Sequence, residues 1–237
     1  MNTLLKIPGV IQVLDRIVVG YHPTGRLHKA ARDGDLEEVR RLLVGGSCHV
    51  NDIDKKNRTP LHYACAYGQT EVVDFLVKNK CDIHLCDSDN NTPLVKAIQQ
   101  QEEECATILL ENGADVNVQD PNGGTPLHHA VCTNNTSVAA KLLLHKANIE
   151  AQNKDGCTPL LLALKENKHR MAEFLIKAKA NIHAVDMRGR TALMLAVRYE
   201  SPDITNLLIE GGIDVSVEDV DGGTALCYSV ASGCNIL

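Results

Sequence analysis

A short motif that begins with Thr recurs along this chain at a fixed spacing, and this recurrence constrains the fold more than any other feature. Successive threonines of the motif are 33 residues apart in all five intervals. The six copies are Thr59-Pro60-Leu61-His62, Thr92-Pro93-Leu94-Val95, Thr125-Pro126-Leu127-His128, Thr158-Pro159-Leu160-Leu161, Thr191-Ala192-Leu193-Met194 and Thr224-Ala225-Leu226-Cys227. Such a period predicts a stack of similar units, in which each unit buries its apolar face only against its neighbours.

The first unit is irregular. Its segment Leu27-His28-Lys29-Ala30-Ala31 matches Leu61-His62-Tyr63-Ala64-Cys65 at an offset of 34 residues. The first unit therefore has one extra residue, which we place in the loop 45–50.

The motif has the features of a helix start. In the copy at Thr125, the threonine is placed to cap the helix, and Pro126 occupies the first helical position, where a missing N–H has no cost. Leu127 then faces the core, and Ala130 allows a neighbouring helix to approach closely. We expect His128 to bridge the turns of adjacent units through its two ring nitrogens.

A second helix follows in each unit, with apolar residues at helical spacing, as in residues 72–76. In the fullest copy it ends near Gly113, because glycine readily adopts the left-handed conformation of a helix cap. The corresponding stops at Lys146 and Lys179 lack the glycine. We expect those two helix ends to be looser.

The period and the Thr-Pro-Leu-His signature resemble those of ankyrin repeats, each a β-turn followed by two antiparallel helices. The resemblance covers residues 25–237 and implies an all-α ankyrin-repeat solenoid of helix-turn-helix units with β-hairpin tips. It implies a domain at 21–237 with six repeats near 24–53, 54–86, 87–119, 120–152, 153–185 and 186–218, and a truncated seventh at 219–237. We expect this last repeat to fray, or a longer form of the protein to complete it.

The segment 1–20 is an apolar leader, which we interpret as a short helix packed on the first repeat or as a disordered segment. Pro8 and Gly9 interrupt its apolar run early, and Lys6, Asp15 and Arg16 add charges. It therefore lacks the uncharged stretch of roughly 20 residues that spans a bilayer. Binding of this leader to a membrane surface is the alternative.

Composition narrows the classes of partner and compartment. The net charge is -6, so the chain lacks the basic excess that a nucleic-acid surface needs. Nine cysteines, without the density of a disulfide scaffold, are interpreted as reduced thiols that act as small buried hydrophobes. This predicts a cytoplasmic or nuclear protein and a monomer.

Several segments resemble more closely the ankyrin module of the POTE group and of related ankyrin repeat domain proteins that carry coiled coils. They are Gly20-Tyr21-His22, Lys96-Ala97-Ile98-Gln99, residues 103–110, residues 147–155 and Phe174-Leu175-Ile176-Lys177. The resemblance implies a scaffold. The chain has no sustained heptad pattern, so the alternative is a structural or regulatory module of a longer protein that is inactive without a C-terminal coiled-coil region.

The sequence carries no pattern that predicts an enzyme, a cofactor or a metal. Cys81, His84 and Cys86 offer a single Cys-x4-Cys pair without a second pair, and His128-His129 supplies only two ligands. Cys65 and Cys132 fall near the ends of first helices, where a small apolar residue is ordinary. The turn 120–124 has only two adjacent glycines and does not predict a phosphate loop.

The resemblance implies that a partner protein binds on the concave side, formed by the hairpin tips and the exposed face of each first helix. The residues that this geometry selects are Lys55, Lys56, Arg58, Tyr67, Asp89, Lys154, Asp155, Lys165, Met187, Arg188, Arg190, Arg198 and Tyr199. Tyr and Arg are enriched among residues that dominate binding energy. We therefore favour two basic patches, one at Tyr67 and one at Tyr199, which predict an acidic segment on the partner; solvated surface charge is the alternative.

One further hypothesis concerns modification. Asn117 closes Asp115-Val116-Asn117 and follows Leu109 by eight positions, a pattern similar to the sites that asparaginyl hydroxylases modify in ankyrin proteins. The alternative is that Asn117 only bonds the backbone of its turn.

Overall fold

The computed structural model of the chain describes residues 25–199 and 201–232, so the leader predicted at 1–20 lies outside the described residues. The first helices of the layers are α2 (Arg26–Asp33), α4 (Pro60–Ala66), α6 (Pro93–Gln99), α8 (Pro126–Cys132), α10 (Pro159–Lys165), α12 (Ala192–Arg198) and α14 (Ala225–Ser232). The second helices are α3 (Leu36–Val44), α5 (Thr70–Lys78), α7 (Glu103–Glu111), α9 (Thr136–Leu144), α11 (His169–Lys177) and α13 (Pro202–Glu210).

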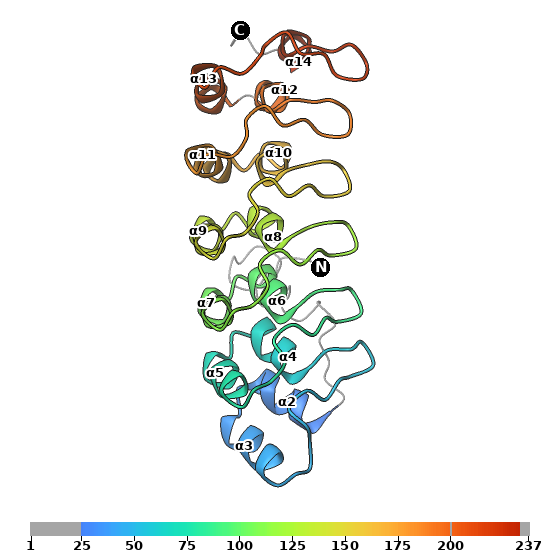
Figure 1. Cartoon of the computed structure of the whole chain (residues 1–237), viewed down its shortest axis with the longest axis vertical. Coiled ribbons are helices and arrows are strands. Elements are labelled where there is room, and N and C mark those ends of the chain that lie inside the picture. Colours follow the sequence, from blue (N-terminus) through green and yellow to red (C-terminus); the bar gives the residue numbers. More distant parts are fainter. Residues whose placement is uncertain (1–24, 200, 233–237) are drawn as a thin grey trace, which may run out of the picture.

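The helices form two columns in a single elongated stack (Figure 1). One column holds the first helices and the other holds the second helices, and long loops project beyond the column of first helices. Each first helix from α2 to α12 contacts its own second helix and the first helix of the next layer, as α4 contacts α5 and α6. The fold is therefore an all-α solenoid, as the resemblance to ankyrin repeats implied.

The projecting loops are hairpin tips without strands. The described residues contain no β-strand and one isolated bridge, between Val185 and Thr191. Each tip is instead closed by a backbone hydrogen bond across four residues, as in the bond from Asp54 N to Arg58 O at 3.0 Å. The hairpins are too short for a ladder, although the chain reverses where the sequence predicted.

The Thr motif starts the first helices as predicted. The side chains of Thr59, Thr92, Thr158 and Thr191 each accept a hydrogen bond from the backbone N–H three residues on. These bonds satisfy an N–H that has no partner within the helix. Thr125 forms a capping box with His128, in which the Thr125 backbone N–H donates to His128 Nδ1 at 3.2 Å.

Motif histidines connect neighbouring layers. In His62, Nδ1 accepts from the Thr59 N–H, so Nε2 carries the proton and donates to Asn91 O at 3.0 Å. His128 makes the equivalent bond to Cys157 O, also at 3.0 Å. The predicted bridge by His128 between adjacent turns is thus confirmed.

Each second helix ends with a residue in the left-handed conformation. Three of these positions are glycines and three are lysines: Gly46, Lys80, Gly113, Lys146, Lys179 and Gly212. Lys146 and Lys179 have φ values of 69° and 68°, so they adopt the same cap as Gly113 despite their side chains. The predicted looseness of those two ends stays a prediction.

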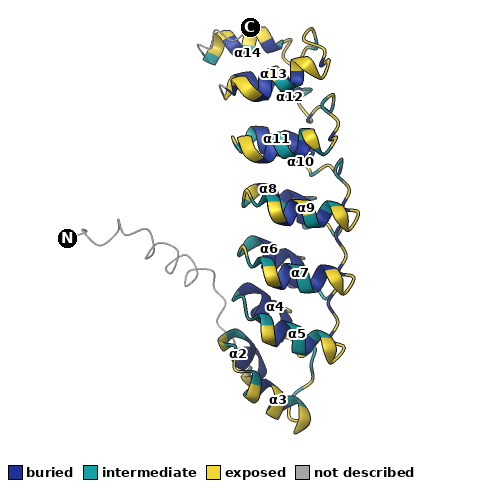
Figure 2. Cartoon of the chain, turned by 90° about the vertical axis from the view of Figure 1, so that its left-hand side faces the viewer, coloured by how far each residue is buried: buried dark blue, intermediate teal, exposed yellow. Residues whose placement is uncertain are grey.

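The core consists of thin apolar layers, one for each helix pair (Figure 2). Four cysteines are buried in it, namely Cys65, Cys81, Cys105 and Cys157. Cys132 and Cys227, however, are exposed. The interpretation of the cysteines as buried hydrophobes therefore holds for only some of them.

Candidate binding face

The tips are rigid because one side chain organises each of them. Asp54 Oδ1 accepts hydrogen bonds from the backbone N–H groups of Lys56 and Arg58, at 2.8 and 2.9 Å. The same pair of bonds recurs every 33 residues, at Asp87, Asp120, Asn153, Asp186 and Asp219. Residues in the turn between these bonds are consequently held in fixed positions.

Backbone hydrogen bonds also tie successive tips together. The amides of Ser88, Lys154, Met187 and Val220 each donate to a carbonyl of the preceding tip, at 2.8–3.0 Å. The equivalent position in the remaining tip is Pro121, which has no N–H to donate to the Asp89 carbonyl. There the side chain of Asn90 donates to Gln119 O instead, at 2.7 Å.

Arg58 is buried in its tip, so its prediction as a residue that contacts a partner was wrong. The residue is only 6% exposed, and its guanidinium pairs with Asp54. Tyr63 also donates to that carboxylate, at 2.8 Å. Although burial opposes ionisation, the hydrogen bonds from Arg58 and Tyr63 hold the pKa of Asp54 well below its ordinary value. The Arg58 guanidinium is therefore engaged by Asp54 within the tip.

The patch around Tyr199 is also less basic than predicted. Arg190 is half-buried and donates to Asp186, and Arg188 pairs with Asp221 of the next tip. A third predicted residue, Lys165, pairs with Asp155 at 2.9 Å. In each case an acidic side chain on the same face neutralises the cation.

Four of the predicted basic residues on this face have no acidic partner within the described part of the chain. They are Lys55, Lys56, Lys154 and Arg198, which are exposed and form no ion pair within the described part of the chain. The guanidinium carbon of Arg198 lies 6.0 Å from the centre of the Tyr199 ring. The other predicted contacts are arranged around them, with Asp89 and Met187 exposed and Tyr67 half-buried.

Sequence reasoning missed a row of side chains that the first helices turn toward the tip carboxylates. Lys96 Nζ lies 3.0 Å from Asp87, His129 Nε2 lies 3.1 Å from Asp120, and Tyr228 donates to Asp219 at 2.6 Å. Burial lowers the pKa of His129, and Asp120 opposes this effect. The detectable signal is a polar residue nine positions after the tip acid in each of these three repeats.

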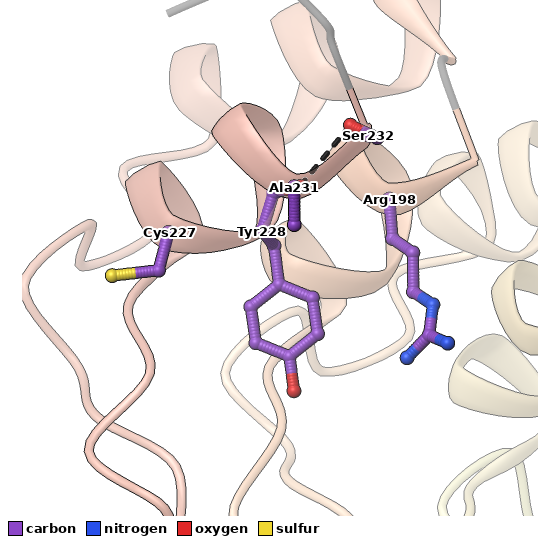
Figure 3. A pocket seen from close by; sticks show the side chains of 5 residues that line it. All are labelled: Arg198, Cys227, Tyr228, Ala231 and Ser232. Atoms are coloured by element: carbon purple, nitrogen blue, oxygen red, sulfur yellow. Dashed lines mark hydrogen bonds between the residues drawn. The ribbon is translucent and has the colours of Figure 1, made fainter.

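A hollow of about 480 Å³ lies on α12 and α14. Its lining residues are Arg198, Cys227, Tyr228, Ala231 and Ser232. Figure 3 shows the Tyr228 ring and the Arg198 guanidinium extending in the same direction, while the Cys227 thiol points away from them. The hollow therefore combines an apolar wall with one unpaired cation.

The cysteines and histidines that the sequence offers as metal ligands do not converge on a common point. Burial raises the pKa of Cys81 to about 12, and the Cys86 thiol contacts the His84 carbonyl oxygen at 3.6 Å. His128 and His129 reach different partners, Cys157 O and Asp120. Within residues 25–199 and 201–232 no three His, Cys, Asp or Glu side chains gather closely enough to hold a metal ion.

Asn117 links two layers through its side chain. Its Oδ1 accepts from Asn148 N at 2.8 Å, and its Nδ2 donates to Lys146 O at 3.4 Å. The residue is exposed nonetheless. Both side-chain bonds go to the backbone of the next loop, whereas within its own turn Asn117 bonds through its backbone N–H, which donates to Asp115 Oδ1. The alternative of a side chain that only bonds its own turn is therefore not what the structure has.

The described helices are also too short, or too polar, for any of them to cross a bilayer.

Stacked helix pairs with projecting tips define a repeat solenoid. A family model described as "Ankyrin repeats (3 copies)" matches residues 27–120, 114–186 and 180–237, and the chain belongs to the ankyrin-repeat family. Domains of this family are typically non-enzymatic modules for protein–protein interaction.

Particular relatives were found by sequence and by structure. The chain is 52% identical over 50 residues to the human ankyrin repeat domain-containing protein 7, a match that covers 21% of this chain and 20% of that protein. The ankyrin repeat domain of Bcl-3, a member of the IkappaB family, has a TM-score of 0.79 at 28% identity and covers 86% of this chain and 93% of its own. That of human ASB11 has a TM-score of 0.76 at 25% identity, covering 90% and 94%.

Proposed function

We propose that this chain is a non-enzymatic scaffold that binds a partner protein on its concave side, along the hairpin tips and the exposed face of the first helices. The observation that carries the proposal is the difference among the basic residues of this face. Arg58, Arg188, Arg190 and Lys165 are paired internally, whereas Lys55, Lys56, Lys154 and Arg198 form no ion pair in the described part of the chain. These unpaired cations lie on tips or helix ends whose backbone is held by hydrogen bonds, so binding has to order their side chains but no loop backbone.

An acidic segment is the partner chemistry that this charge distribution favours. The chain as a whole has a net charge of -6, so exposed cations without counter-charges stand out on this face. Tyr199 and Met187 add apolar area beside them, and Tyr is among the residues that dominate binding energy. Binding should therefore weaken as salt concentration rises.

The proposal extends to oligomeric state, compartment and modification. We propose a monomer in the cytoplasm or nucleus, a reducing compartment in which the exposed thiols of Cys132 and Cys227 stay free. Hydroxylation of Asn117 requires an enzyme to free its side chain from Asn148 and Lys146. A mass increase of one oxygen on the peptide containing Asn117, after co-expression with a hydroxylase, would establish that site.

The second candidate is a structural or regulatory module of a longer protein that depends on a coiled-coil region. It is kept because the match to the human relative spans only 20% of that protein's length. Partner capture by the isolated chain discriminates between the two candidates, since a dependent module captures nothing by itself.

The test is quantitative capture of cellular proteins by chemical crosslinking, with purified chain as bait. The variant Lys55→Glu/Arg198→Glu reverses two unpaired cations, and Lys78→Glu/Arg170→Glu reverses two exposed cations on the second helices as a control. We expect at least one protein captured by the wild type to fall about tenfold with the first variant, as for a loss of about 1.4 kcal/mol, and to be retained by the second. Equal capture by both variants would remove this face from consideration.

A further inference from the structure

The residue that follows the acid or amide at the start of each tip is exposed in all six tips. These residues, which we call the tip row, are Lys55, Ser88, Pro121, Lys154, Met187 and Val220. Met187 is 73% exposed although a further tip follows it, and Val220 is 67% exposed. Exposure is therefore a property of this position within a tip.

The chemistry of the tip row changes along the stack. Lys55 and Lys154 are cations that form no ion pair within the described part of the chain, and the two tips between them present neutral residues. The row ends in Met187 and Val220, which lie on adjacent tips because Val220 N donates to Arg188 O at 2.9 Å. Large apolar residues exposed side by side mark an interaction site.

The charged residues on the two apolar tips are already paired. Arg188 pairs with Asp221 across the two tips, and Arg190 pairs with Asp186. The unpaired Arg198 belongs to the end of α12 and not to a tip. An acidic group that lies along the tips therefore has a cation to meet at the earlier tips, but none at the last two.

Contacts between the tips fix their spacing. Lys154 N donates to Asn122 O at 2.8 Å, and Met187 N donates to Asp155 O at 3.0 Å. A Cβ on Gly156 would lie 2.7 Å from Met187 N, so the glycine allows the two tips to touch. Figure 1 shows the tips projecting in one row along the stack. Packed helices lie about 8–10 Å apart, so successive tips advance by about that distance.

An extended polypeptide has the same repeat distance. Three residues of an extended or polyproline-type chain advance about 9–10 Å, so every third side chain of such a segment can face the next tip. An α-helix advances about 1.5 Å per residue and would need roughly 30 residues to cover the six tips, more than twice the usual helix length of about 10–14 residues. The tip row therefore favours an extended occupant.

We propose that the tip row binds an extended segment of a partner protein, in which every third side chain faces a successive tip. Counted from the first tip to the last, the segment has acidic side chains at i and i+9, opposite Lys55 and Lys154, and large apolar side chains at i+12 and i+15, opposite Met187 and Val220. At i+3 the exposed Asp89 disfavours an acid. This inference rests on the proposed function and adds the order and spacing of the recognised groups.

Synthetic peptides test the spacing. The first peptide spans the six tips, with Glu at positions 1 and 10, Leu at positions 13 and 16, and Ser, Thr or Gln elsewhere. The second is its reverse, because the tip row does not fix the direction of the bound chain. Each has a control of equal length and composition, in which the same four residues follow in the same order at steps of two residues instead of three. Binding is followed by NMR titration of the ¹⁵N-labelled full chain.

We expect one of the two peptides to give saturable shifts at the amides of the tips, and its control to bind about tenfold more weakly. Met187→Ser/Val220→Ser should also weaken that peptide about tenfold, and unchanged amide shifts of the helices show that the variant is folded. Arg170→Glu reverses an exposed cation of α11 in the column of second helices and should leave the affinity unchanged.

Charge exchange tests which acid faces which lysine. Lys154→Glu should weaken the peptide several-fold, and Lys in place of the Glu opposite it should restore binding. Lys in place of the other Glu should not restore it. The variant Lys55→Glu should show the converse pattern.

Three results would overturn the proposal. They are the absence of saturable shifts with either peptide, equal affinity for a peptide and its control, and equal restoration of Lys154→Glu by Lys at either position. The proposed function is tested separately by capture. If capture of a cellular protein still depends on Lys55 and Arg198 after the spacing has failed, the tips bind a partner of another shape; if it does not, both proposals fail.

Discussion

His62 illustrates how a single buried side chain fixes the distance between two layers. Its ring accepts from the Thr59 N–H and donates to Asn91 O, which requires the neutral form with the proton on Nε2. Burial lowers its pKa to about 4 despite opposing contributions from Asn91 and Asp87. The histidine motif thus makes the stack sensitive to acid.

The unfolded chain binds more protons than the folded chain between the ordinary His pKa of about 6.5 and the folded value. The free energy of unfolding should therefore fall as pH is lowered through this window, by up to about 3 kcal/mol from His62 alone. Urea unfolding at pH 7.5, 5.5 and 4.5 measures this slope. His62→Gln should show a shallower slope than wild type; equal slopes would refute the assignment to His62.

A second prediction at this scale concerns the lysines that replace glycine at helix ends. Lys179 has a φ of 68°, a conformation that costs a residue with a Cβ about 1 kcal/mol. Lys179→Gly should raise the free energy of unfolding by about that amount, whereas Lys177→Gly, at the last residue of α11 and paired with Glu173, should lower it. A destabilised Lys179→Gly in chemical unfolding would show that the lysine contributes contacts that outweigh its strain.

At the scale of elements, the tips form a nearly continuous row that Pro121 interrupts. Ser88 N donates to Lys56 O and Lys154 N donates to Asn122 O, but Asp89 O receives no such bond because proline has no N–H. We expect this point to be the weakest link between neighbouring tips.

Pro121→Ala restores the donor and should create the missing bond to Asp89 O. Amide exchange tests this directly, because the new backbone amide at position 121 should exchange as slowly as those of Ser88 and Lys154. Exchange at the rate of an unprotected amide would mean that the two tips are too far apart to bond.

The positions of the helices were largely predictable from the sequence. The ion pairs between side chains of the tips were not. Thr at position one and Pro at position two specify where a helix starts, because both act through local backbone geometry. Arg58 was assigned to the surface because tip residues are usually exposed. Its burial depends on Asp54 four residues earlier, on the turn between them and on Tyr63 from the helix, which only the folded hairpin brings together. The same spacing in Asp186 and Arg190 gives the same pairing.

At the scale of the whole molecule, the stack provides a face that is far longer than any single layer. Its stability is a sum of layers and interfaces, so substitutions on the tips change recognition with little effect on the fold. The period predicted a stack of similar units, and the resemblance to ankyrin repeats implied this architecture. Neither could predict which charges remain available for a partner, because that depends on contacts between tips, such as Arg188 with Asp221.

The central claim is that a partner protein binds along the tips and first helices, and site-specific photocrosslinking tests it most directly. A photoreactive amino acid is placed at Met187, 73% exposed on a tip, or at Leu144, 80% exposed at the end of α9 in the column of second helices. The account predicts a crosslinked partner from position 187 and none from position 144. Crosslinking of the same partner from position 144 alone, or equally from both, would contradict it.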